Sequence, residues 1–200
     1  MKLALVLCLL AQPALSDPYD VLRTAQGLFD RLPDVQERGD YGEVCGMGRN
    51  SNPHIGFCTT QNMIYVSEAF AGRALAPYEL AHVLGHAIQV RHGVADVALN
   101  AIRNRRDEEG ALRGMVTRQV ECVAGVLMAA AGHARIDLRA LPQEPFTDAH
   151  WGRAPLNAGP RVTIGLDARA EWYDIGYEAQ DFAACTVGEM SADLIVEALR

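Results

Sequence analysis

The chain has 200 residues, of which 50% are hydrophobic, 22% are charged and 6% are aromatic. This length and apolar content predict one globular domain with its own core, and they exclude a disordered or collagen-like chain. The 25 acidic residues outnumber the 18 basic ones, which gives a formal net charge of −7 and argues against nucleic acid or an anionic membrane surface as the main partner.

The start of the chain has the pattern of a secretory signal peptide. The basic Lys2 precedes an apolar run at residues 3–10, and small residues follow before position 17. We therefore expect residues 1–16 to be a signal peptide and residues 17–200 to form a single domain in the periplasm or outside the cell. A buried N-terminal helix is the alternative. No later stretch reaches about 18 apolar residues without charge, so we expect no membrane span.

Hydrophobic periodicity and turn residues predict the elements of the mature chain. In chain order they are a helix over 18–32, two short strands at 55–59 and 63–67 joined as a hairpin, a helix over 77–90, a polar connection at 103–110, a long helix over 111–131, an ordered proline-rich loop at 142–160, a helical segment over 165–184 and a short last helix capped by Ser191. The predicted fold class is therefore α+β, mostly helical, with a small β-sheet and two long helices that face each other.

Four cysteines lie in the predicted mature chain, at Cys45, Cys58, Cys122 and Cys185. An even number in an oxidising compartment predicts two disulfides, for which three pairings exist. Cys45 with Cys58 is the local choice, because the segment between them is rich in turn-forming Gly and Asn. Cys122 with Cys185 would then join two distant segments. Free buried thiols are the alternative.

Two histidines lie four residues apart in the helix predicted over 77–90. Residues at this spacing share one helix face, so His82 and His86 could hold one zinc ion between them. Histidines at this spacing are, however, more often surface or core residues that bind no metal.

Four stretches of the chain resemble the motifs of a known family. They are Cys58 with Ile64-Tyr65-Val66, then Ala81-His82-Val83-Leu84-Gly85-His86 with Gln89, then Gln119-Val120-Glu121-Cys122-Val123-Ala124-Gly125-Val126, and last Arg169, Trp172, Gly176, Tyr177 and Cys185. In this order, over about residues 40–190, they are similar to a bacterial family of neutral zinc metallopeptidases of the gluzincin type. The resemblance implies a zincin-like metallopeptidase fold, a zinc cofactor on His82 and His86, and cysteine pairings that agree with those above.

The chain departs from this family at the positions that carry the chemistry. The family's general base, a Glu after the first His, is replaced by Val83, and the third zinc ligand falls on Thr117. A threonine hydroxyl is a poor zinc ligand, and loss of a general base typically costs about 10²–10⁴-fold in rate. Glu121 stands where the family has an Asp. It is therefore expected to hydrogen-bond a metal-binding histidine on the side of the ring that faces away from the metal. Ile164-Gly165-Leu166 also stands in place of the expected His-Gly-Thr.

These departures predict an exported metallopeptidase-like protein that has lost proteolytic activity and binds a peptide or protein in the old cleft. Zinc could still be held by His82 and His86, with Glu121 or no residue as third ligand. The remaining histidines that could complete such a site are His54, His92, His133 and His150. One alternative is an active zinc endopeptidase whose base is a water held by Glu121 or a nearby His. Another is a structural envelope protein without a ligand.

Overall fold

The computed structural model describes residues 17–39, 52–146, 148–149 and 161–200. The expected signal peptide, Cys45 and His150 lie outside these residues. The helices are α1 (Tyr19–Leu28), η1 (Phe70–Gly72), α3 (Ala76–Arg91), α4 (Val94–Asn104), η2 (Arg106–Glu108), α5 (Glu109–Ala130), η3 (Leu138–Ala140), α6 (Leu166–Ala179), η4 (Phe182–Cys185) and α7 (Asp193–Glu197). The strands are β1 (Asp34–Glu37), β2 (Ile55–Cys58), β3 (Met63–Val66), β4 (Asp148–Ala149) and β5 (Arg161–Val162).

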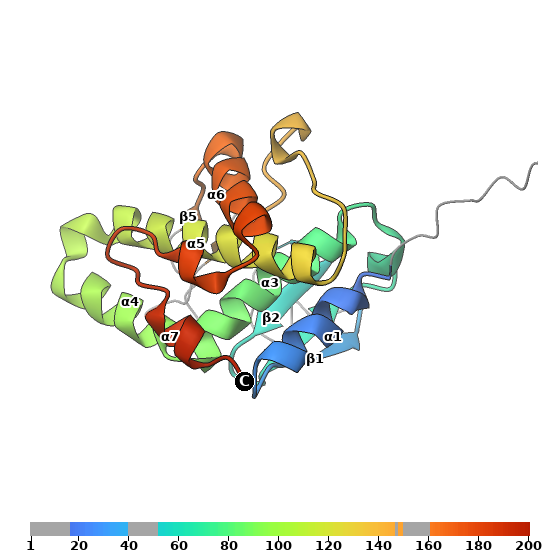
Figure 1. Cartoon of the computed structure of the whole chain (residues 1–200), viewed down its shortest axis with the longest axis horizontal. Helices are drawn as coiled ribbons and strands as arrows, with labels where there is room; N and C mark the ends of the chain where they lie inside the picture. Colours follow the sequence, from blue (N-terminus) through green and yellow to red (C-terminus); the bar gives the residue numbers. More distant parts are fainter. Residues whose placement is uncertain (1–16, 40–51, 147, 150–160) are drawn as a thin grey trace, which may run out of the picture.

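The architecture is α+β and mostly helical, as the periodicity predicts. The long helix α5 contacts both α3 and α6, and α1 and the small sheet pack on the α3 side (Figure 1). The main core gathers apolar side chains from these helices, the sheet and the C-terminal segment. The two long predicted helices therefore face each other, as expected. None of the helices in the described parts of the chain is both long and apolar enough to span a bilayer.

The sheet has the strand order β1-β3-β2, with β1 parallel and β2 antiparallel to β3. The predicted hairpin of β2 and β3 is confirmed. The amide of Ser67 donates to the carbonyl of His54 at 2.9 Å, so the backbone groups of His54 and Ser67 point toward each other between the two strands. Because bonding residues alternate along an antiparallel strand, the backbone groups of Ile55 and Phe57 point to the outer edge of β2.

Strand β1 and helix α4 are absent from the predicted elements. In β1 only Val35 is apolar, so its four residues show no useful alternation. In α4 the buried residues Val94, Ala95, Ala98 and Ile102 follow helical spacing, so the sequence did carry a periodic signal for this helix. Strand β1 is stabilised by its pairing with β3 rather than by a pattern of its own.

Two predicted helices end earlier than their periodicity suggests. Helix α1 stops at Leu28 because Phe29 is extended and forms a β-bridge with Leu199. Helix α6 stops at Ala179 because Gln180 takes a left-handed backbone conformation, with φ of 52°. Ser191 was predicted to cap the last helix, but the N-cap position of α7 is Ala192; the Ser191 hydroxyl, one residue earlier, accepts a hydrogen bond from the amide of Asp193.

The predicted disulfide between Cys122 and Cys185 is confirmed. It joins α5 to η4 across a sequence separation of 63 residues. Cys58 is also disulfide-bonded, with its partner outside the described residues. Its pairing with Cys45 stays a prediction.

Candidate functional site

Helix α3 carries the two histidines on one face. The rings of His82 and His86 are 5.1 Å apart between centroids and inclined by 77°. His82 is 1% exposed, whereas His86 is partly exposed. The four-residue spacing therefore places one imidazole in the core and the next toward its rim.

A buried carboxylate from α5 lies against the inner histidine. Glu121 Oε1 is 3.1 Å from His82 Nδ1, and Glu121 is fully buried. The hydroxyl of Tyr78 donates to Glu121 Oε2 at 2.8 Å, and Arg169 Nη1 donates to Oε1. Both carboxylate oxygens are thus engaged within the protein. The carboxylate therefore lies beside Nδ1, on one side of the His82 ring.

The guanidinium of Arg169 holds this neighbourhood together from α6. It is fully buried, and its Nε donates to Glu144 Oε2 at 2.8 Å. Its Nη2 donates to the carbonyl of Phe146 at 2.9 Å. One cation therefore bridges two carboxylates and a backbone carbonyl from separate parts of the chain. Charge-assisted hydrogen bonds of this kind are among the stronger ones in proteins.

Aromatic rings surround the inner histidine. Phe146 stacks on His82 with centroids 4.1 Å apart and an interplanar angle of 10°. The ring of Tyr78 packs against those of Phe146 and Tyr173, with ring centroids 6.1 Å and 5.7 Å apart. Burial raises the pKa of Tyr173 well above its ordinary value. One face of the His82 ring is therefore covered by an apolar side chain.

The two positions at which the resemblance led us to expect carboxylates are both buried. Val83 is 6% exposed and Thr117 is fully buried on α5. A valine side chain neither accepts nor donates a proton, so Val83 has no acid–base chemistry. A threonine hydroxyl ionises only far above neutral pH and competes poorly for zinc.

A catalytic zinc usually has three protein ligands and one open position. His82 and His86 supply two imidazoles, but Glu121 is engaged by Arg169 and Tyr78. In residues 17–39, 52–146, 148–149 and 161–200, no three His, Cys, Asp or Glu side chains gather so that they could hold a metal ion. The described donor set therefore does not fit a catalytic zinc site.

The other described histidines have surroundings of their own. His54 Nδ1 is 3.3 Å from the Ser67 hydroxyl oxygen, and His92 packs against Phe29 with ring centroids 5.5 Å apart. His133 lies just beyond the C-terminal end of α5. None of the three joins His82 and His86 in a metal-binding group within the described residues.

A cavity of about 290 Å³ lies at the start of α3. It is lined by Asn52, Pro53, His54, Arg73, Leu75, Glu79, Leu141, Pro142, Gln143 and Pro145. The buried Glu79 accepts two hydrogen bonds from Arg73, at 2.8 and 3.0 Å. Asn52 Nδ2 is 3.5 Å from the carbonyl of Pro145, whose neighbour Phe146 stacks on the inner histidine. One wall of the cavity is therefore continuous with the histidine neighbourhood.

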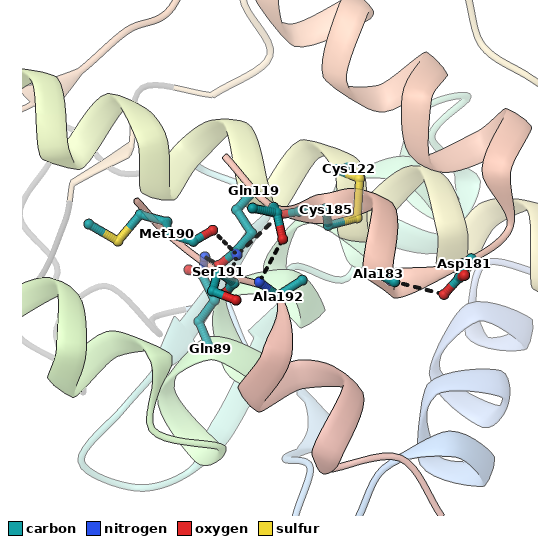
Figure 2. Close-up of a disulfide and its surroundings, with 10 residues drawn as sticks. Gln89, Gln119, Cys122, Asp181, Ala183, Cys185, Met190, Ser191 and Ala192 are labelled. Carbon is teal, nitrogen blue, oxygen red and sulfur yellow. Dashed lines mark hydrogen bonds between the residues drawn. A yellow bond between two sulfur atoms is a disulfide. The ribbon is translucent and has the colours of Figure 1, made fainter. Parts of the chain in front are cut away.

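Sequence reasoning missed the partners that surround the histidines. Tyr78 stands one helical turn before His82 on the same face, and this spacing could have indicated it. Glu144 and Phe146 lie in a loop without periodicity, so no local signal marked them. Gln89 and Gln119, two of the family-like motif residues, lie elsewhere and connect α3 and α5 to the C-terminal segment (Figure 2).

We compared the chain with family models, with curated proteins and with solved structures, and none of the three comparisons found a match.

Proposed function

We propose that the chain is an exported, zincin-like relative of neutral zinc metallopeptidases that does not hydrolyse peptides and binds a peptide or protein segment. The observation that carries the proposal is the state of the histidine neighbourhood. Val83 stands at the base position, and Glu121 is held by the Arg169 guanidinium.

The loss of hydrolysis follows from the chemistry of these positions. Peptide hydrolysis at a zinc site needs a group that takes a proton from water and returns it to the leaving amine. Val83 offers no such group, and Thr117 stands where a carboxylate ligand is expected. Glu121 would have to leave Tyr78 and Arg169 to serve either role. Leaving a buried guanidinium without its partner is costly.

Binding of an extended segment requires an edge strand and a groove rather than a base. Among the described strands, β2 lies at one edge of the sheet, and Ile55 and Phe57 present backbone groups outward. His54, which directly precedes β2, lines the cavity at the start of α3. A peptide that pairs with β2 could place a side chain in this cavity, which is the usual form of β-strand addition.

The decisive chemical experiment restores the missing residues. The double variant Val83→Glu/Thr117→Glu is expected to gain zinc-dependent cleavage of a quenched fluorescent peptide library, because the histidine pair is already in place. Purified Val83→Gln/Thr117→Gln, of similar size but uncharged, is the matched control and should stay inactive. Zinc is measured by mass spectrometry, and 1,10-phenanthroline should abolish only the gained activity.

Binding is tested on the unaltered mature protein with a displayed peptide library in the presence of EDTA. We expect capture that persists without metal and falls in Phe57→Pro, which removes an outward amide of β2. Glu37→Pro is the matched control at the opposite edge. There Arg38 donates to Val66, so the alternate residue Glu37 faces outward.

Two results would replace the proposal with its alternatives. Chelator-sensitive cleavage by the unaltered protein would show an active endopeptidase with another base. If the protein neither cleaves nor captures peptides, the result would support a structural protein without a ligand.

A further inference from the structure

The cavity at the start of α3 contains one ion pair with an unequal exposure of its members. Arg73 donates to Glu79 through Nε at 3.0 Å and through Nη2 at 2.8 Å, so the carboxylate lies along one edge of the guanidinium. Glu79 is 1% exposed, whereas the side chain of Arg73 is 32% exposed. The buried carboxylate therefore fixes the orientation of a guanidinium that still reaches the solvent.

A guanidinium has a second edge that matches a carboxylate. Its five N–H groups lie in one plane, and the Nη1–Nη2 edge can donate to two oxygens in the same way as the Nε–Nη2 edge. Among the residues that the structure describes, the guanidinium of Arg73 donates only to Glu79, through Nε and Nη2. Arg73 also lines the cavity. One edge is thus occupied, and the other is available to a ligand.

The same protein shows that one guanidinium can bind two carboxylates at once. Arg169 donates through Nε to Glu144 and through Nη1 to Glu121. A second carboxylate on Arg73 would repeat this arrangement, with Glu79 on one edge and the ligand on the other. The presence of Glu79 therefore does not exclude an anionic ligand from the cavity.

The rest of the cavity lining is apolar or uncharged at neutral pH. Leu75, Leu141 and three prolines supply apolar surface, and Asn52, His54 and Gln143 supply polar groups. Its volume of about 290 Å³ is close to the lower limit of small-ligand pockets, so it suits a single amino-acid residue. The lining therefore favours a ligand with one negative group and an apolar body.

The position of the cavity relative to β2 determines which end of a paired peptide reaches it. Residues 52–54 line the cavity and directly precede β2, which is an edge strand among the described strands. A segment that pairs with β2 in the antiparallel sense runs from the Cys58 end toward the Ile55 end. Its C-terminal end therefore lies at the cavity. A parallel segment would bring an N-terminal ammonium group, which the guanidinium repels.

We propose that the cavity binds the C-terminal residue of the peptide, with its α-carboxylate on the Nη1–Nη2 edge of Arg73 and its side chain against the apolar lining. This inference rests on the proposed peptide-binding function and names the part of the peptide that is recognised. Charge-assisted hydrogen bonds at two points are strong and geometrically specific. Capture of a C-terminal carboxylate is also a recurring mode of peptide recognition.

The overall charge of the protein does not decide this preference. The formal net charge of −7 opposes the approach of an anionic peptide, but physiological salt screens exposed charges that are more than about 10 Å apart. The contact with Arg73 acts at hydrogen-bond distance, where screening is small. The preference for a free carboxylate should therefore persist at physiological salt.

The test compares two synthetic pools of random hexapeptides with acetylated N-termini, one with a free C-terminal carboxylate and one with a C-terminal amide. Each pool is passed over the immobilised mature protein in EDTA, and captured peptides are quantified and sequenced by mass spectrometry. We expect at least about ten-fold more capture from the acid pool, because hydrogen bonds to charged groups are worth that much. Apolar residues should be enriched at the last position.

The outcomes separate this proposal from the function on which it rests. Equal capture from both pools overturns C-terminal recognition and leaves peptide binding intact. Capture from neither pool overturns both. Enrichment of Asp and Glu inside the captured peptides, without a preference for a free end, also overturns the proposal, because the cavity would then bind acidic side chains.

Two variants assign the preference to the guanidinium. Glu79→Gln removes the competing charge and keeps Arg73, so the preference for the acid pool should be equal or larger. Arg73→Gln/Glu79→Gln removes both charges together, so no buried carboxylate loses its partner, and the preference should disappear. Arg23→Gln, at an exposed arginine that does not line the cavity, is the control for charge and should keep the preference. A preference that survives in the double variant overturns the role of Arg73.

Discussion

Arg169 decides the state of the histidine neighbourhood more than either histidine does. It is fully buried and donates to Glu121, to Glu144 and to the carbonyl of Phe146. These groups come from α5 and from the loop before β4, and α6 brings the guanidinium between them. Because a buried charge without a partner is unfavourable, each member requires the others.

The first prediction concerns removal of this cation. Arg169→Met is expected to lower the free energy of unfolding by about 3–5 kcal/mol, because Glu121 would stay buried without its partner. Arg139→Met is the matched control, since Arg139 pairs with Asp174 at the surface and exposed pairs contribute about 0–1 kcal/mol. Urea unfolding of both variants measures the difference. Similar losses in the two would contradict a special role for Arg169.

At the level of elements, α5 is the helix on which the others are assembled. It contacts α3 through the face with Thr117 and Glu121, and it meets α6 backbone to backbone. A Cβ atom built on Gly125 would lie 2.1 Å from the carbonyl oxygen of Tyr173, and one on Gly176 would lie 1.9 Å from that of Cys122. Only glycine fits at this crossing.

The second prediction concerns that crossing. Gly125→Ala should destabilise the protein by about 3 kcal/mol or more, because the new methyl group meets backbone atoms that cannot move away singly. Gly110→Ala, in the same helix but with nothing within 4 Å, is the matched control. It should be neutral or stabilising by up to about 1 kcal/mol. Thermal unfolding monitored by circular dichroism distinguishes them, and equal effects would show that the crossing is looser than described.

For the whole molecule, two histidines link stability to pH. Burial lowers the pKa of His133, and this effect outweighs Asp20 and Asp17, which raise it. Burial, together with the charges of Arg31 and Arg91, also lowers the pKa of His92. A lowered pKa means that the unfolded chain takes up these protons more readily than the folded one.

The third prediction follows from this sign. Above the ordinary histidine pKa of 6.5, the contribution of His133 to the free energy of unfolding is complete. It is lost as the pH falls from there through the lower pKa of His133 in the folded protein. His133→Gln should therefore flatten the fall of the urea midpoint between about pH 7.5 and pH 5.5, where histidine titrates. Part of the slope should remain because of His92. An unchanged slope in the variant would remove His133 from this linkage.

Local patterns were sufficient for the features that depend on neighbours along the chain. The four-residue spacing of His82 and His86 predicted one helix face, since helical hydrogen bonds join residues four apart. The expectation that hydrolysis is lost depends on Val83 and Thr117 as the family resemblance aligns them, and it stays a prediction. The hairpin of β2 and β3 was also predicted from local sequence, because its two strands are adjacent along the chain.

Partners that lie far apart along the chain were decided by the tertiary structure. Glu121 and Arg169 are 48 residues apart, and only the close crossing of α5 and α6 brings them together. Strand β1 exists because β3 offers it a partner, and Phe146 reaches His82 from a loop without any pattern. The physical reason is that helix and turn formation depend on local backbone hydrogen bonds, whereas the choice of a distant partner depends on how packed surfaces fit.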